Sequence, residues 1–262
     1  MKLLFIAIVV LLAALPDSVM ASQTRDRDWP GRSVVFVAHR GGIVPGTPEN
    51  TLRAFREAIR QGVHAIEVDL RGTKDGAVVI MHDETVDRTT NGRGNVTDLT
   101  LAELTRLDAG QGERIPTCEE VLKIVAGTGV TVLLDIKTSP VLNKSKVVRL
   151  TEKHNAVLNV IVGARNLEDL RAFKTLNPNF RTLGFIRGIE DIEPFVQAGV
   201  DIIRLWPEWI HKDPGVIKKV HRLGKPVWTT AGSASCEELE ALIQLGVNGI
   251  LSDTPSLVNS LK

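Results

Sequence analysis

The sequence predicts an α/β fold with a parallel sheet, arranged as a single (β/α)8 barrel of the TIM type with a lobe inserted after the third strand. Short runs of apolar and β-branched residues alternate with amphipathic segments along the chain, the pattern of parallel strands joined by helices. Several amphipathic segments end at a glycine, which favours a left-handed helix C-cap. Residues 22–262, roughly 240 residues, match the size of one such barrel, so we expect one domain.

Each predicted strand is a short apolar run, as expected for strands that are buried on both faces. In chain order, the predicted strands are 34–38, 65–70, 78–81, 131–136, 160–163, 182–185, 202–205, 226–230 and 249–251. The predicted helices are 51–61, 117–126, 147–154, 167–176, 189–198, 214–223 and 236–245. These nine strand candidates exceed the eight strands of a barrel, so we expect one of them to lie outside it or to be misassigned.

The strand–helix alternation is interrupted in two places. Only residues 70–77 separate the second strand from the third, and Lys74-Asp75-Gly76 has the composition of a tight turn. Because a crossover helix needs about a dozen residues, the chain either returns in extended form or makes a hairpin here. The second interruption, about 83–116, is polar and contains one short helical pattern at 101–107. We expect this insertion to form a lobe over the strand ends.

The first 21 residues have the pattern of a secretory signal peptide. A basic Lys2 precedes an apolar stretch over 3–15, and Val19-Met20-Ala21 fits a cleavage site. The alternative is an uncleaved membrane anchor, but the stretch is shorter than the about 20 residues that a spanning helix needs. We therefore expect an exported protein, periplasmic or extracellular, without a stable membrane anchor after cleavage.

Charge and cysteine content narrow the possible partners. Lys and Arg number 32 against 31 Asp and Glu, and no basic block could follow a nucleic-acid backbone. We therefore expect a small-molecule substrate and no nucleic acid. Cys118 and Cys236 lie far apart in the sequence and are predicted to be unpaired thiols, with a disulfide as the alternative in an oxidising compartment. The sequence leaves the oligomeric state undetermined.

Two histidines and a pair of carboxylates follow or end predicted strands. His39 and His82 each come directly after an apolar run, and Glu67 and Asp69 share one face of the strand between them. Two carboxylates on one face suit Mg²⁺ or Ca²⁺, whereas the alternative is a pair answered by nearby Lys or Arg. Imidazoles titrate near neutral pH, so this arrangement favours acid–base catalysis beside a metal ion.

A second pair and a helix start add further candidates. Asp135 and Lys137 share a strand face, where they could complete a metal shell and meet a ligand anion, or form a simple ion pair. Glu49 is a further candidate metal ligand, or a charge near a helix N-terminus, where Asn50 is expected to be the N-cap. The other histidines, which are His64, His154, His211 and His221, are expected to be solvated or packing residues.

An ordered series of motifs resembles the glycerophosphodiester phosphodiesterase family. The motifs are His39-Arg40-Gly41, Pro48-Glu49-Asn50-Thr51, Glu67-Val68-Asp69, Thr73-Lys74-Asp75-Gly76, His82-Asp83, Arg88-Thr89-Thr90-Asn91-Gly92, Leu107-Asp108-Ala109-Gly110, Ile115-Pro116-Thr117, Asp135-Ile136-Lys137 and Ser252-Asp253-Thr254-Pro255. They are dense over the first half of the mature chain. No one motif is diagnostic, but the ordered series is specific.

The resemblance implies a barrel enzyme that hydrolyses glycerophosphodiesters to an alcohol and glycerol 3-phosphate. It implies that Glu67, Asp69 and Asp135 bind a divalent cation, Mg²⁺ or Ca²⁺, and that His39 and His82 are the acid–base pair. Arg40 and Lys137 would bind the phosphate. In the implied mechanism the neighbouring glycerol hydroxyl attacks phosphorus, and water then opens the cyclic phosphate. The order in which the histidines act stays open.

Two departures from the family pattern bear on the substrate. The third acid is commonly Glu, and Asp135 is one methylene shorter. The late strand usually ends Trp-Thr-Val-Asn, whereas this chain has Trp228-Thr229-Thr230-Ala231-Gly232. Trp206 and Trp209 could supply an apolar wall or simply pack. The alternatives are therefore phospholipase D-like action on lysophospholipids or another bulky diester, and a non-catalytic phosphate-binding barrel.

Overall fold

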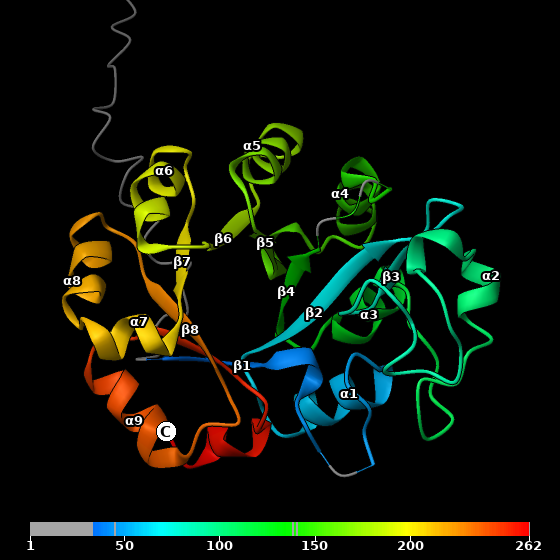
Figure 1. Cartoon of the computed structure of the whole chain (residues 1–262), viewed down its shortest axis with the longest axis horizontal. Helices are drawn as coiled ribbons and strands as arrows, with labels where there is room; N and C mark the ends of the chain where they lie inside the picture. Colours follow the sequence, from blue (N-terminus) through cyan, green and yellow to red (C-terminus); the bar gives the residue numbers. More distant parts are fainter. Residues whose placement is uncertain (1–33, 45, 138, 140, 262) are drawn as a thin grey trace, which may run out of the picture. The chain divides into compact units, whose positions relative to one another are not determined.

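The computed structural model describes residues 34–44, 46–137, 139 and 141–261. The signal peptide predicted at 1–21 lies outside them. The sheet has the order β1-β9-β8-β7-β6-β5-β4-β2-β3, and a further β1–β2 pairing closes it into a ring. All pairings are parallel except β2–β3, so the predicted eight-stranded parallel barrel is confirmed, with helices around the outside of the ring (Figure 1).

The bounds of the elements lie close to those predicted. The barrel strands are β1 (Val35–Ala38), β2 (Ala65–Gly72), β4 (Thr131–Ile136), β5 (Val160–Ala164), β6 (Arg181–Phe185), β7 (Ile202–Leu205), β8 (Val227–Gly232) and β9 (Gly249–Ser252). The helices are α1 (Leu52–Arg60), α2 (Leu101–Leu104), α3 (Cys118–Val125), α4 (Lys144–Lys153), α5 (Leu167–Leu176), α6 (Ile192–Gln197), α7 (Pro207–Lys212), α8 (Gly215–Arg222) and α9 (Cys236–Gln244). Helix α7 was not predicted from the sequence. Among the described residues, none of the helices is long and apolar enough to span a membrane.

The extra strand candidate, which is the third in chain order, lies outside the barrel. β3 (Val78–Ile80) pairs antiparallel with β2, with Leu70 opposite Ile80, so the hairpin alternative is correct. The insertion follows β3 and has its own apolar cluster, composed of Val79, Met81, Val86, Val96, Leu104, Ala109 and Ile115. Cys118 and Cys236 are free thiols, as predicted.

Both faces of the barrel strands are buried, one in the apolar core and the other in the barrel interior. Alternate residues such as Ile66, Val68 and Leu134 belong to the large apolar core, while Glu67 and Asp135 between them point the other way, into the barrel. Parallel pairing brings the carboxyl ends of the strands to one end of the barrel, where ligands bind in such folds.

Bulky rings fill the barrel interior where neighbouring strands carry glycine. A Cβ at Gly163 would lie 2.4 Å from the Phe185 ring, and one at Gly249 would lie 2.6 Å from three atoms of the Trp228 ring. Trp228 is fully buried and paired in register with Gly249. The glycine is therefore required by close packing between β8 and β9.

Gly249→Ala should lower the free energy of unfolding by about 1–3 kcal/mol, because the added methyl group meets a buried ring that cannot move aside. Urea denaturation measures the change. The matched control is Gly188→Ala, whose Cβ would meet only the flexible carboxylate of Glu190. Equal stability of the two variants would contradict this account of the packing.

Candidate active site

Three buried carboxylates meet at the carboxyl ends of β2 and β4. Glu67 and Asp69 lie on the same face of β2, and Asp69 is in register with Asp135 of β4. Their exposed fractions are 1%, 0% and 2%. One carboxylate oxygen from each lies within 4.8 Å of the others. Adjacent parallel strands thus deliver a compact set of oxygen donors, as the spacing of the sequence motifs implies.

Two basic side chains neutralise part of this cluster. Lys137 Nζ lies 2.7 Å from Asp69 Oδ1 and 2.6 Å from Asp135 Oδ2. Arg165, directly after β5, donates from Nε to Asp135 Oδ1 at 3.0 Å and also pairs with Oδ2. Asp69 and Asp135 therefore match the alternative expected from the sequence, in which the carboxylates form ion pairs with nearby Lys or Arg.

Glu67 is left with less compensation. It accepts the backbone N–H of Arg40 at 2.8 Å, but among the described residues it forms no ion pair with Lys or Arg. Burial, and then the charge of Asp69, raises the pKa of Glu67, whereas the pKa of Asp69 is lowered because the charge and hydrogen bonding of Lys137 outweigh its burial. A hard divalent cation would supply the positive charge that Glu67 lacks, so the donor set fits Mg²⁺ or Ca²⁺.

The loop before α1 supports this cluster. Asn50 has a positive φ of 57° and donates from Nδ2 to Asp69 Oδ2 at 2.6 Å. The N-cap prediction for Asn50 is wrong, because Thr51 caps α1 by accepting the N–H of Ala54. Because the Asn50 side chain is hydrogen-bonded to Asp69, it does not cap the helix.

Glu49 does not belong to the carboxylate cluster. Its oxygens accept from Arg40 Nη1 at 3.1 Å and from Arg88 Nη1 at 2.9 Å. Arg88 lies in the insertion and also donates from Nε to Asp83 Oδ2 at 2.6 Å. These contacts tie the insertion to the loop that carries Glu49.

Each catalytic candidate histidine is held by a carboxylate. Nδ1 of His39 lies 2.7 Å from Asp253 Oδ1, and Nδ1 of His82 lies 2.7 Å from Asp83 Oδ1. Since Nδ1 of each ring is engaged, Nε2 is the nitrogen free to exchange a proton with a ligand. The carboxylate partner also favours the charged imidazolium.

The surroundings shift the two imidazoles in opposite directions. Burial lowers the pKa of His39, but the bond to Asp253 and the charge of Glu67 outweigh it, so the pKa is raised. For His82, burial outweighs the bond to Asp83, and the pKa is lowered. The two groups therefore differ in proton affinity, as an acid and a base do.

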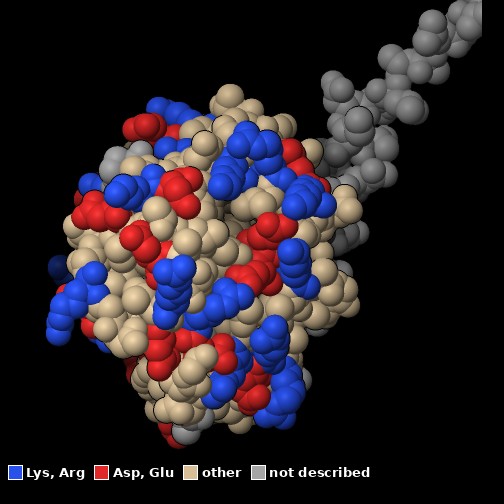
Figure 2. All heavy atoms as spheres, turned by 90° about the vertical axis from the view of Figure 1, so that its right-hand side faces the viewer, with Lys and Arg blue, Asp and Glu red and all other residues tan. Residues whose placement is uncertain are grey.

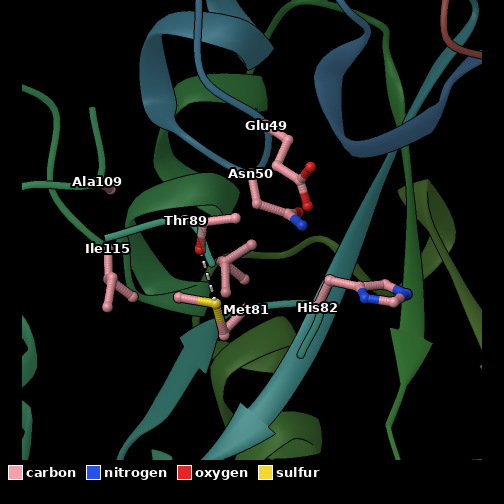
Figure 3. A pocket seen from close by; sticks show the side chains of 8 residues that line it. Glu49, Asn50, Met81, His82, Thr89, Ala109 and Ile115 are labelled. Atoms are coloured by element: carbon pink, nitrogen blue, oxygen red, sulfur yellow. Dashed lines mark hydrogen bonds between the residues drawn. The ribbon is translucent and has the colours of Figure 1, made fainter. Parts of the chain in front are cut away.

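His82 is one of the residues that line a small cavity of about 10 Å³ (Figure 3). The other lining residues are Glu49, Asn50, Ile80, Met81, Thr89, Ala109 and Ile115. The imidazole points away from the wall formed by Met81 and Thr89, whose hydroxyl donates to the Met81 sulfur at 3.4 Å. The insertion thus packs against one side of His82, and the ring is directed away from this cavity.

Several residues at the site were not assigned a role from the sequence. They are Asp253, Asp83, Arg88, Arg165 and Arg204. Asp253 meets His39 only in the folded structure, whereas Asp83 follows His82 in a sequence motif. The signal available in the sequence was that each aspartate comes shortly after a predicted strand. Trp206 follows β7 and is 38% exposed, whereas Trp209 packs against the core.

One face of the molecule is of mixed charge. Figure 2 shows the right-hand side of Figure 1, where basic and acidic side chains alternate around a hollow rather than gathering into a single patch. This distribution agrees with the near-neutral chain and offers no continuous basic surface on that face.

Several known proteins are similar to this chain in sequence and in fold over most of their length. A family model described as "Glycerophosphoryl diester phosphodiesterase family" matches residues 39–257. The chain is 35% identical over 242 residues to a glycerophosphodiester phosphodiesterase of Caldanaerobacter subterraneus subsp. tengcongensis, covering 87% of this chain and 98% of that protein.

Solved structures give the same result. A phosphodiesterase of Oleispira antarctica, in complex with the product sn-glycerol-3-phosphate, superposes with a TM-score of 0.79 at 26% identity, over 87% of this chain and 96% of that one. A glycerophosphodiester phosphodiesterase of Agrobacterium tumefaciens has a TM-score of 0.75 at 26% identity, over 87% and 99%. The range matched by the family model, 39–257, spans the carboxylates and both histidines. The chain belongs to the glycerophosphoryl diester phosphodiesterase family and is an enzyme of that activity.

Proposed function

We propose that this enzyme is a metal-dependent hydrolase that cleaves glycerophosphodiesters to an alcohol and glycerol 3-phosphate, with His39 and His82 as its acid–base pair. The observation that carries the proposal is the placement of two carboxylate-held imidazoles beside the buried carboxylate trio. The complex of the Oleispira antarctica phosphodiesterase with sn-glycerol-3-phosphate supports the choice of product.

The residues of this chain account for the reaction as follows. One histidine takes the proton of the glycerol hydroxyl next to the phosphate, and that oxygen attacks phosphorus. The other histidine protonates the departing alcohol oxygen, and a cyclic phosphate remains. In the second half, water attacks phosphorus with the histidine roles reversed, and the ring opens to glycerol 3-phosphate.

The basic residues stabilise the anion. Arg40 lies between Glu49, which accepts from Nη1, and Asp69, whose Oδ2 is 3.6 Å from Nε. Nε has no hydrogen bond, so a phosphate oxygen would satisfy it. Lys137 holds its ammonium between Asp69 and Asp135. Glu67, Asp69 and Asp135 would hold Mg²⁺ or Ca²⁺, which supplies Lewis-acid stabilisation of the phosphoryl charge when bound.

A second candidate substrate class is a lysophospholipid. It rests on the indole of Trp206, which stays 38% exposed directly after β7. Release of the head group from a lysophospholipid at a higher rate than from glycerophosphocholine would favour this class over the water-soluble diesters.

His82→Ala should lower kcat for glycerophosphocholine by roughly 100-fold or more, since one proton transfer in each half-reaction loses its group. Release of glycerol 3-phosphate measures the change. The matched control is His221→Ala, an exposed histidine that contacts Asn248, and it should keep wild-type activity. Full activity of His82→Ala would refute the two-histidine mechanism.

Asp253→Asn should lower kcat by at least about tenfold while leaving KM nearly unchanged, because an amide can no longer orient the imidazole of His39 in the same tautomer. Steady-state kinetics separate the two constants. Ser233→Ala is the control: it removes a 3.1 Å bond to the other Asp253 oxygen and spares His39. A larger loss for Ser233→Ala than for Asp253→Asn would contradict this role.

Removal of divalent ions with a chelator should abolish turnover, and Mg²⁺ or Ca²⁺ should restore it. Added ion should also raise the Tm of the wild-type protein, because a ligand of the folded state stabilises it. Glu67→Gln should reduce that increase in Tm. Turnover that survives exhaustive chelation, with no effect of added ion on Tm, would exclude a metal-dependent reaction.

A further inference from the structure

Arg204 is a buried cation whose guanidinium is incompletely hydrogen-bonded. It lies on β7 and is only 2% exposed, yet neither Nε nor Nη1 has a hydrogen bond. No ion pair to it is seen among the described residues. Burying an unpaired charge is unfavourable, so buried arginines normally meet a carboxylate or phosphate.

The side chain is directed into the barrel. Its neighbours Ile203 and Leu205 belong to the outer apolar core, and Arg204 therefore points to the opposite face. In the closed strand order, β7 is the strand opposite β2, which carries Glu67 and Asp69. Arg204 thus faces the carboxylate cluster across the barrel rather than forming part of it.

Aromatic rings hold the guanidinium and leave its edge free. Its central carbon lies 3.7 Å from the centroid of the Trp206 ring and 5.2 Å from that of Phe185. Arg165, which pairs with Asp135, lies 5.0 Å from the same Phe185 ring. Stacking satisfies the faces of a guanidinium but not its N–H groups, which lie in its plane.

The charges around Arg204 do not replace a partner. Asp135 and Glu208 attract it from a distance and Arg165 repels it, and burial together with Arg165 lowers its pKa to about 10. The group is therefore still charged at neutral pH. The N–H groups on Nε and Nη1 are buried without a hydrogen bond, and an anionic group of a ligand would satisfy them.

We propose that Arg204 is a specificity-determining residue that binds an anionic group on the alcohol part of the phosphodiester. This inference rests on the proposed function and extends it to a substrate class: diesters whose alcohol carries a carboxylate or a second phosphate. In this proposal the phosphate binds at the carboxylate cluster of β2 and β4, and the alcohol part is directed toward β7 on the opposite side of the barrel, where Nε and Nη1 of Arg204 have no hydrogen bond.

A matched pair of substrates isolates this contact. Glycerophosphoserine differs from glycerophosphoethanolamine by a carboxylate, so the ratio of their kcat/KM values reports recognition of that group. We expect a ratio of about tenfold or more in the wild-type enzyme, because a charge-assisted bond to a buried arginine discriminates at that level. Arg204→Met should bring the ratio close to one, and Arg204→Lys should retain part of it.

The control is Arg187→Met, an exposed arginine after β6, which should leave the ratio unchanged. Calorimetric titration of both diesters into His82→Ala, with and without Arg204→Met, reports binding in the absence of turnover. Hydrolysis of both substrates without a preference, or a preference that survives Arg204→Met, would overturn the inference but not the proposed function. Absence of all hydrolysis would overturn the proposed function, and the calorimetric ratio would still decide the role of Arg204.

Discussion

The structure depends on the burial of three carboxylates at the ends of two adjacent strands. The apolar residues between them fix the register, because Ile66 and Val68 must face the outer core and a slip of one residue would turn Glu67 and Asp69 away from the barrel. The same β2–β4 pairing that packs the core therefore assembles the donor set. The cost of this burial is the reason that basic and amide groups converge on it.

Compensation of this charge extends across the barrel. Lys137 and Arg165 reach the carboxylates directly, and Arg165 shares the ring of Phe185 with Arg204. Glycine at 163 makes room for that ring. The interior thus passes from an acidic side, where a divalent cation would offset the carboxylates, through an aromatic residue to a basic side at Arg204, where the second anionic group of a diester would be favoured.

Much of the site could be predicted because strand ends are visible as apolar runs that stop at a polar residue. His39 and His82 stand at such positions, whereas Glu67, Asp69 and Asp135 lie within β2 and β4 and were predicted from shared strand faces. The partner of His39 could not be predicted in this way, because Asp253 is 214 residues away and meets it only when β1 pairs with β9. Helix α7 was missed because six residues after a strand give too little periodicity. Asn50 was misjudged because capping residues also serve as hydrogen-bond donors in tertiary contacts.

The two histidines are positioned by different parts of the fold. His39 follows β1, and its partner Asp253 follows the paired strand β9, so closure of the barrel sets its orientation. His82 follows β3, which lies outside the barrel. The backbone carbonyl of His82 accepts hydrogen bonds from Nε and Nη2 of Arg71, at 3.1 and 2.8 Å. Its ring is held through Asp83, which the insertion reaches through Arg88. Changes in the insertion can therefore shift one imidazole relative to the other without disturbing the barrel that holds the carboxylates.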